Sequence, residues 1–248
     1  MQLAASIVSH DQASLLADLL KDLDQLNFEN PMLFVVTENS ANPSAIAVAK
    51  ASKLFKDGWM QCIHNPKPLG FGANHNQAFN LVQTKADIFF VLNPDLRINE
   101  DIFSGLGESL TINPAIGIIA PQVINPNGMK EDSARYFPSA ARITRKILFN
   151  DLGRFPGHPS QMYYPDWMAG MCLGFAKHAY TELEGFDERY FMYYEDADIC
   201  RRAHALGYRP AVNPVHSVVH AAQRKSHKSM GLLLHHLASM LRFLVNKT

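Results

Sequence analysis

The sequence predicts an α/β fold built on a mostly parallel sheet with helices on its faces. Short apolar runs of strand length alternate with stretches in which apolar side chains recur at helical spacing. This alternation is repeated four times between residues 1 and 95, which implies right-handed crossovers between parallel strands. With 248 residues, of which 47% are hydrophobic and 19% charged, the chain can bury the core of one such domain.

The first part of the chain contains regular strand and helix pairs. Strands are expected where apolar residues form short runs, and the first helix is expected where leucines recur between Leu15 and Leu26. The expected elements, in chain order, are a strand at 3–8, a helix over 12–26, a strand at 32–36, a helix over 43–56, a strand near 60–63, a helix over 73–83 and a strand at 87–92.

The second part of the chain is less regular. Residues 121–165 are rich in Pro, Asn, Gly, Arg and aromatic residues, which predicts hairpins and a long loop. The other expected elements are a helix around 100–112, a strand at 116–120, a strand at 166–176, helices near 177–184 and over 195–206, and short strands at 209–213 and 217–219.

Composition argues against several classes of protein. Lys and Arg total 23, as do Asp and Glu, so the chain has no overall basic field for nucleic acid. The three cysteines are widely separated and form no CxxC pair, which favours a reducing compartment and argues against a zinc cluster. Residues 1–9 are too short for a signal peptide, and no apolar run approaches roughly 18 residues. We therefore expect a cytoplasmic protein, with a contact at the inner face of the membrane left open.

Three successive strands end in polar segments. These are residues 9–11 (Ser-His-Asp), 38–40 (Glu-Asn-Ser) and 93–95 (Asn-Pro-Asp). In an open parallel sheet, ligands bind beyond the carboxyl ends of the strands. Any one of these segments is explained as an ordinary polar turn, but three in succession favour a binding edge.

A glycine-containing loop at 65–76 leads into the third helix. Its backbone could approach a diphosphate closely. The loop lacks the dinucleotide-binding fingerprint, because His75 stands where the third glycine would be and because the loop follows the third strand. A plain turn is an equal explanation for this loop when it is considered alone.

Acids and aromatic residues are concentrated at 187–198. Glu195 and Asp196 would open a helix, where the helix dipole favours acids whatever their function. The four aromatic residues between positions 190 and 194 would also desolvate a carboxylate, which raises its pKa and makes it a better base. The segment is therefore a candidate for catalysis as well as for helix capping.

Two residues elsewhere could bind a metal ion. A hard divalent cation that bridges a diphosphate needs only one or two protein carboxylates, and Asp95 could be one of them. His220 follows two valines and could be a further ligand. A turn aspartate and a structural histidine are the ordinary alternatives.

The C-terminal segment predicts an amphipathic helix. Its apolar face would carry Met230, Leu233, Leu234, Leu237, Leu241 and Leu244. The basic residues around this face are Arg224, Lys225, Lys228, Arg242 and Lys247. We expect the helix to pack on the core or to form a homodimer contact, and the alternative is a basic helix that rests on an anionic membrane.

These motifs resemble those of family 2 inverting glycosyltransferases, in particular the rhamnosyltransferase-like branch. They follow the order of that family and cover nearly the whole chain. The matching segments are 7–11 (Ile-Val-Ser-His-Asp), 35–40 (Val-Val-Thr-Glu-Asn-Ser), 65–76, 92–95 (Leu-Asn-Pro-Asp), 167–170 (Trp-Met-Ala-Gly), 185–188 (Gly-Phe-Asp-Glu), 194–198 (Tyr-Glu-Asp-Ala-Asp) and 219–220 (Val-His).

The resemblance implies a single domain of the A-type glycosyltransferase fold, with a mostly parallel nucleotide-binding sheet and a smaller acceptor-side region. Residues 1–115 would form the nucleotide-sugar-binding half and residues 116–222 the acceptor and catalytic half. Residues 223–248 would form the C-terminal amphipathic helix.

The resemblance also implies roles for the matching side chains at the reacting centre. Asp196 corresponds to the catalytic base, with Glu195 beside it orienting the acceptor. Asp95 and His220 correspond to ligands of Mg²⁺ or Mn²⁺. The acceptor would be bordered by Trp167 and Gly170.

A further set of residues would bind the donor, and Glu38 among them corresponds to the acid that reads the pyrimidine base. The set is Ser9, His10, Glu38, Asn65, Gly70, Phe71, Gly72, Asn74 and Asn93. Some positions depart from the commoner pattern of the family. His10 stands where Tyr is frequent, and Asn93 replaces the first acid of the Asp-x-Asp motif.

The implied function is a metal-dependent inverting transfer of a sugar, with rhamnose as one candidate. The donor would be a dTDP- or UDP-sugar, and the acceptor a hydroxyl of a cell-surface or lipid-linked saccharide. The alternatives are a non-catalytic relative that binds nucleotide sugars and a nucleotidyltransferase. The latter usually has a basic phosphate loop near its first strand, which residues 9–11 do not supply.

Overall fold

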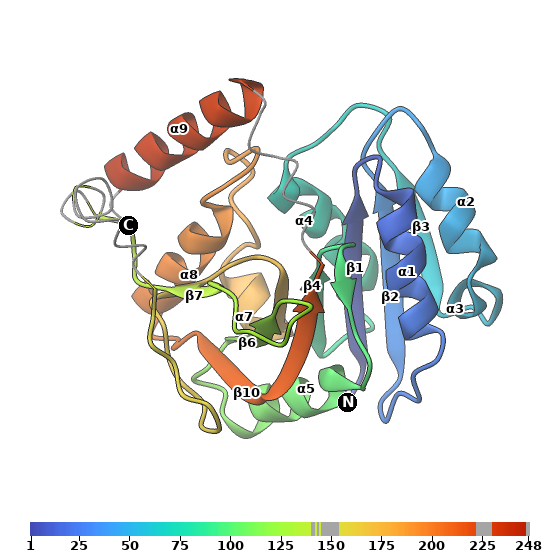
Figure 1. Ribbon diagram of the computed structural model, residues 1–248, viewed down its shortest axis with the longest axis horizontal. Coiled ribbons are helices and arrows are strands. Elements are labelled where there is room, and N and C mark those ends of the chain that lie inside the picture. Colours follow the sequence, from blue (N-terminus) through green and yellow to red (C-terminus); the bar gives the residue numbers. More distant parts are fainter. Residues whose placement is uncertain (140–141, 143, 145–153, 222–229, 247–248) are drawn as a thin grey trace.

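A computed structural model describes residues 1–139, 142, 144, 154–221 and 230–246 of the chain. Within these residues, a curled sheet of eight strands runs through the molecule in the order β3-β2-β1-β4-β9-β6-β10-β5. Helices cover both faces of this sheet (Figure 1). The α/β class expected from the sequence is confirmed.

The first half of the chain forms the regular strand and helix pairs that the sequence predicts. In chain order its elements are β1 (Leu3–Ser9), α1 (Ala13–Leu23), β2 (Met32–Glu38), α2 (Ser44–Ala51), α3 (Lys53–Lys56), β3 (Met60–His64), α4 (Phe71–Val82), β4 (Ile88–Leu92), β5 (Leu96–Arg97) and α5 (Ile102–Ile112).

The second half adds strands of both directions. Its elements are β6 (Ile118–Ile124), β7 (Ala134–Arg135), β8 (Trp167–Met168), β9 (Cys172–Ala176), α7 (Lys177–Glu182), α8 (Glu195–Ala205), β10 (Ala211–His220) and α9 (Met230–Val245).

The central strands are buried on both faces because helices pack on each side of them. In β4, Phe90 belongs to the core under α1, α2 and α5, whereas its neighbour Phe89 belongs to the core under α4, α7 and α8. All five residues of β4 are buried, which is the pattern of a central strand covered on both sides. The helices in turn bury one stripe each, as the leucines of α1 do.

The pairing of the strands brings the polar segments to one edge of the sheet. β1 lies between β2 and β4 and is parallel to both of them. The register pairs Ser9 with Glu38 and Ile7 with Leu92, so the three strands end at nearly the same level. The segments that follow them share the edge at which ligands bind in such sheets.

The antiparallel strand β9 brings a second set of residues to the same edge. It lies between β4 and β6 and runs opposite to both, and Cys172 at its start pairs with Leu92 at the end of β4. Residues 167–171, which precede β9, therefore lie at the carboxyl end of β4. β10 runs parallel to β6 and ends at His220, which pairs with Leu96 of β5.

Three predicted elements differ from those observed. The single helix expected over 43–56 is two helices, because Ser52 is extended and its hydroxyl accepts a hydrogen bond from the backbone N–H of Phe55 at 3.2 Å. The strand expected at 166–176 is split between β8, which pairs with β7, and β9 of the main sheet. The short strands expected at 209–213 and 217–219 are one strand, β10, with an irregularity between Asn213 and Ser217.

The region expected as hairpins and a long loop also contains regular structure. β6 continues to Ile124, and the two-residue strand β7 follows it. Neither β7 nor β5 was predicted, because a two-residue strand has no detectable periodicity. The rest of that region is described only in part.

The C-terminal helix forms as predicted, and of the expectations for its apolar face only packing on the core disagrees with the structure. Leu234 and Leu241 are exposed, whereas Ser239 and Phe243 are buried. Figure 1 shows α9 at the periphery of the molecule, beyond α8. Among the described residues, no helix combines the length and apolarity needed to cross a bilayer.

We predict that Gly174→Val destabilises the fold by about 1–3 kcal/mol, because the middle of β9 has no room for a side chain. Gly174 pairs with Phe90 on one side and Ile119 on the other, and a Cβ there would lie 2.6 Å from the Phe90 ring. Urea unfolding monitored by circular dichroism measures the loss. The double variant Gly174→Val/Phe90→Leu is the control, and simple additivity of the two costs would contradict the steric explanation.

Candidate active site

The segments that follow β1 and β2 are held together by hydrogen bonds across the sheet edge. The Nδ1 atom of His10 lies 2.6 Å from the carbonyl oxygen of Asn39, and the Ser40 hydroxyl donates to the Asp11 carboxylate at 2.8 Å. Asp11 has a positive φ of 55°. Polar contacts therefore fix the edge and hold Asp11 in a strained backbone conformation of the kind that often occurs at functional sites.

Glu38 is fully buried at this edge. Its carboxylate accepts hydrogen bonds from the backbone N–H groups of Ala45, at 3.1 Å, and Asp11, at 3.4 Å. Ala45 lies in the first turn of α2, where N–H groups and the helix dipole favour a negative charge. Glu38 thus joins the loops that follow β1 and β2. If Glu38 contacts a nucleotide base, it must do so while it keeps these two hydrogen bonds.

The loop at 65–70 is attached to the end of β2 by Asn39. The Asn39 side chain donates to the Leu69 carbonyl at 3.0 Å and accepts from the Leu69 N–H at 2.8 Å. Asn65 donates to the side chain of Asn74 at 2.9 Å, and Asn74, which is fully buried, donates to the Gly70 carbonyl at 2.8 Å. These amides fix the path of the loop into α4.

Both glycines of this loop are explained by close packing. A Cβ at Gly70 would lie 2.9 Å from the carbonyl oxygen of Phe191, and a Cβ at Gly72 would lie 2.5 Å from the Cβ of Phe186. The Phe71 N–H donates to the same Phe191 carbonyl at 2.8 Å. The start of α4 therefore contacts the aromatic segment that precedes α8, which the sequence pattern does not reveal.

His75 occupies the position of the missing third glycine and is fully buried. Its Nδ1 atom lies 2.8 Å from the Ser6 hydroxyl, and burial lowers its pKa to about 3. The side chain therefore ties α4 to β1 as a neutral imidazole.

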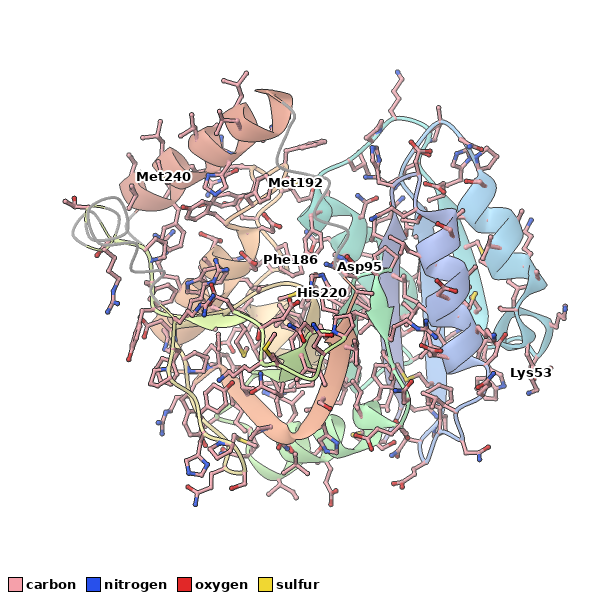
Figure 2. All side chains as sticks on the ribbon, in the orientation of Figure 1. Lys53, Asp95, Phe186, Met192, His220 and Met240 are labelled. Carbon is pink, nitrogen blue, oxygen red and sulfur yellow. The ribbon has the colours of Figure 1, made fainter. Side chains whose placement is uncertain are left out.

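Asp95 and His220 lie side by side near the centre of the molecule (Figure 2). The Nε2 atom of His220 is 3.2 Å from Oδ2 of Asp95, and its Nδ1 atom is 2.8 Å from a carboxylate oxygen of Glu131. Burial lowers the pKa of His220, but the hydrogen bonds and charges of Asp95 and Glu131 outweigh burial and raise the pKa overall. Glu131 was not among the predicted site residues, because it falls in a region without periodicity.

The arrangement around Asp95 fits a divalent cation that is bound mainly by other ligands. Oδ1 of Asp95 is buried without a hydrogen-bond partner among the described residues, so it is free to bind a metal. A carboxylate on the far nitrogen of a histidine is the usual arrangement around a metal-bound imidazole. Within the described part of the chain, no group of three or more His, Cys, Asp or Glu side chains could hold a metal by itself. A diphosphate and water would have to complete the shell.

Asp196 lies at the start of α8 and faces the segment that precedes β9. One oxygen of its carboxylate accepts from the Gly170 N–H at 3.1 Å, and the other accepts from the Ala197 N–H at 2.8 Å. A Cβ at Gly170 would lie 3.2 Å from the Phe71 ring and 3.7 Å from the Cβ of Asp196. The structure therefore places Phe71, Gly170 and Asp196 together, although they are far apart in sequence.

Burial raises the pKa values of both acids at the start of α8. The pKa of Glu195 is raised well above its usual range by burial and by the charge of Asp196. Burial also raises the pKa of Asp196, and the N–H groups of Gly170 and Ala197 and the charge of Arg135 oppose this rise. One oxygen of Glu195 is buried without a partner among the described residues. Raised carboxyl pKa values of this kind suit proton transfer near neutral pH.

Asp198, the third acid of this turn, is held in structural ion pairs. It forms ion pairs with Arg201 at 3.0 Å and with Arg202 at 2.8 Å. The Arg202 guanidinium also donates to the carbonyls of Leu183 and Gly185. Asp198 therefore joins α8 to the end of α7 and is already compensated.

The backbone before α8 is strained. Tyr193 and Tyr194 have φ values of 70° and 69°, in the left-handed region that non-glycine residues rarely adopt. Helix α9 supports this turn, because the Ser239 hydroxyl donates to the Met192 carbonyl at 2.9 Å. The strain is located directly before the pair Glu195 and Asp196.

Trp167 borders the same site through β8. Its indole N–H donates to the Tyr136 carbonyl at 3.0 Å, and the Arg135 guanidinium lies 5.3 Å from the centre of its ring. Arg135 also pairs with Asp132 at 3.0 Å. Arg135 was not predicted as a site residue, although it is the cation whose charge acts on Asp196.

The chain is similar to known rhamnosyltransferases. The N-acetylglucosaminyl-diphospho-decaprenol L-rhamnosyltransferase of Mycobacterium tuberculosis is 30% identical to it over 56% of this chain and 49% of the relative. The rhamnosyltransferase WbbL of Escherichia coli is 24% identical over 72% of this chain and 71% of the relative. The chain spans about half the length of the curated relatives it matches first. No protein-family model matches it.

Solved structures with the same fold are also glycosyltransferases. GalNAc-T7 with UDP, GalNAc and Mn²⁺ superposes with a TM-score of 0.67 at 12% identity, covering 92% of this chain and 44% of that one. A mannosyltransferase of Pyrobaculum calidifontis in complex with GDP-Man and Mn²⁺ gives 0.63 at 13% identity, covering 97% and 64%. The chain therefore has the A-type glycosyltransferase fold. The resemblance to rhamnosyltransferases drawn from the motifs is also confirmed.

We predict that Glu195→Gln flattens the pH dependence of stability. A carboxyl whose pKa is higher in the folded than in the unfolded state stabilises the fold at low pH, and this stabilisation is lost as the pH rises toward the folded pKa. The variant lacks this pH-dependent loss, so the difference between its free energy of unfolding and that of the wild type should shift in favour of the variant as the pH rises above about 5. Denaturant titrations at several pH values measure this, with the exposed Glu108→Gln as the control. A constant difference across the range would contradict the raised pKa of Glu195.

Proposed function

We propose that this chain is a metal-dependent inverting glycosyltransferase, which moves a sugar from a nucleoside diphosphate sugar to a saccharide hydroxyl. The observation that carries the proposal is the position of Asp196. Its partly buried carboxylate is held by the Gly170 N–H, beside Phe71 of the 65–72 loop, at the sheet edge where ligands bind in this class of fold.

In the proposed step, Asp196 takes the proton of the acceptor hydroxyl as that oxygen attacks the anomeric carbon. The new bond to the acceptor oxygen forms while the bond between the anomeric carbon and the diphosphate oxygen breaks. The nucleoside diphosphate leaves with the bonding electrons, and the configuration of the sugar inverts because no enzyme atom bonds to it. Glu195 orients the acceptor next to this base.

Asp95 and His220 would hold Mg²⁺ or Mn²⁺ in this proposal, and Glu131 would orient His220. When bound, such an ion neutralises charge on the leaving diphosphate. Support comes from the unpartnered oxygen of Asp95 and from fold relatives whose structures contain Mn²⁺.

For the donor, we propose that the backbone of the 65–72 loop binds the diphosphate and that Glu38 and His10 border the base. The other donor contacts of the proposal come from Ser9, Asn65, Asn74 and Asn93. Fold relatives contain UDP or GDP-Man, and the similar proteins named above include L-rhamnosyltransferases. We therefore propose a dTDP- or UDP-sugar donor, with dTDP-rhamnose as the first to test.

For the acceptor, we propose a saccharide bordered by Trp167 and Gly170. The name of the mycobacterial relative includes a diphospho-decaprenol acceptor. A lipid-linked saccharide is therefore the first acceptor class to test.

Asp196→Asn should lower the rate of transfer by about 10²–10⁴-fold while donor binding is retained, because the amide cannot accept the proton. Transfer is measured by release of nucleoside diphosphate in the presence of acceptor, and donor binding by calorimetry. The control is Asp187→Asn in the same segment, whose carboxylate pairs with Arg189. Transfer at the wild-type rate in Asp196→Asn would exclude this residue as the base.

Asp95→Asn and His220→Gln should each remove the Mn²⁺-dependent part of the rise in melting temperature that UDP or dTDP produces, because a ligand stabilises only the state that binds it. Glu131→Gln should weaken Mn²⁺ binding by about 10–100-fold, as loss of a partner of a metal-bound histidine does. Thermal-shift titrations with and without Mn²⁺ measure both effects, and the exposed His178→Gln is the control. If nucleotides stabilise the Asp95 variant with unchanged Mn²⁺ dependence, the metal is bound elsewhere.

A further inference from the structure

Helix α9 contacts the rest of the protein mainly through its less apolar side. Ser239 and Phe243 are buried, and the Arg201 guanidinium lies 4.0 Å from the centre of the Phe243 ring while it donates to the Phe243 carbonyl at 2.6 Å. His235 stacks on the ring of Phe191, with 4.8 Å between the ring centres. These contacts fix which side of the helix faces the protein.

The opposite side of α9 is an exposed apolar surface, which we call the leucine face. Its members are between 42% and 76% exposed. They are Leu233, Leu234, Leu237, Leu241 and Val245. A helix on a globular protein normally turns such a stripe toward the core, so a stripe that faces outward indicates a surface for something else.

The charge of the C-terminal segment indicates what covers this face. Residues 221–248 contain five Lys or Arg and no Asp or Glu, so their formal charge is +5 in a chain whose net charge is zero. The preceding residues, 1–220, therefore carry 18 basic and 23 acidic side chains, a formal charge of −5. Apolar side chains on a helix in a basic segment are the combination that binds anionic lipid surfaces.

A second copy of the chain fits this face less well. A symmetric contact through α9 would bring two segments of charge +5 together, and like charges across an interface oppose association. Anionic headgroups would instead neutralise the same charges.

The helix that carries the leucine face contacts, through its opposite side, the segment that leads to the candidate active site. Phe191 contacts α9 through its ring and the start of α4 through its carbonyl, which accepts from the Phe71 N–H at 2.8 Å. Met192, which accepts from Ser239, and Met240 of α9 are labelled in Figure 2 on the same side of the molecule. A surface bound to the leucine face would therefore lie near the segment that leads to Glu195 and Asp196.

We propose that the leucine face of α9 docks the protein on an anionic lipid bilayer. The leucines enter the boundary between headgroups and acyl chains, and the net positive charge of the C-terminal segment favours an anionic surface. Docking of this kind would bring the candidate active site to a membrane that holds a lipid-linked acceptor. Docking itself does not rest on the proposed transfer, since it requires neither donor nor acceptor.

The test is co-sedimentation of the 248-residue chain with vesicles of phosphatidylcholine alone and of phosphatidylcholine with phosphatidylglycerol. Wild-type protein should sediment with the anionic vesicles and be released by high salt, because salt screens the attraction. The variant Leu234→Ser/Leu237→Ser/Leu241→Ser should bind them at least about tenfold more weakly, because it loses three inserted apolar side chains.

The matched control is Leu81→Ser/Ile112→Ser/Leu206→Ser, which changes three equally exposed apolar residues away from α9 and should bind as the wild type does. Thermal melting of both variants verifies that they are folded. Equal vesicle binding by the leucine-face variant and the control would overturn the proposal. The proposal would also be overturned if the wild-type protein does not bind anionic vesicles but forms a dimer that the leucine-face substitutions dissociate. In that case a second copy of the chain covers the leucine face.

Loss of vesicle binding with unchanged nucleotide-induced thermal shifts in the leucine-face variant would support docking as a property separate from donor binding. Conversely, if no nucleotide binds the wild type while anionic vesicles do, the docking surface stands and the proposed transfer fails.

Discussion

The turn at 169–171 holds the two sides of the candidate site in one geometry. The Gly170 N–H fixes the carboxylate of Asp196, and the next carbonyl, that of Met171, accepts from the N–H of Asn93 at 2.9 Å. Asn93 is two residues from Asp95, so one short turn links the candidate base to the candidate metal ligand. Because a displacement of about 1 Å can cost on the order of a hundredfold in rate, such a link matters for any reaction at this edge. A larger residue than glycine at 170 would press on the Phe71 ring.

The three acids at the start of α8 differ in whether an arginine compensates their charge. Asp198 is compensated by Arg201 and Arg202, and removing one partner of such a buried pair typically costs about 3–5 kcal/mol. Among the described residues, Glu195 and Asp196 form no comparable ion pair, and burial raises the pKa values of both. The arginines therefore hold the helix in place without lowering the proton affinity of the two acids that face the site.

The sequence was sufficient to predict the strands of the first half and their parallel arrangement, because β4 and its neighbours have strong apolar runs and the crossovers have a fixed hand. It also placed the strand-end acids at one edge, since parallel strands end together. It could not predict the two-residue strands β5 and β7, the break at Ser52 or the contact of Glu131 with His220, because these depend on pairing between segments distant in the chain. The sequence predicted the apolar face of α9 but left open whether the core, a second copy or a membrane covers it, since periodicity identifies an apolar face but not the partner of that face.

The few contacts that attach α9 determine how local unfolding of the molecule begins. The described contacts of α9 involve the strained segment before α8, Arg201 and a few rings. None of the α9 side chains that the structure describes belongs to the two cores that hold the sheet. A helix bound in this way behaves as a separate cooperative unit, whose amides exchange with solvent through local opening well before the sheet unfolds. When α9 detaches, Tyr193 and Tyr194 lose the contacts that hold them in the left-handed region. A peripheral helix therefore governs the order of a strained turn next to the candidate site.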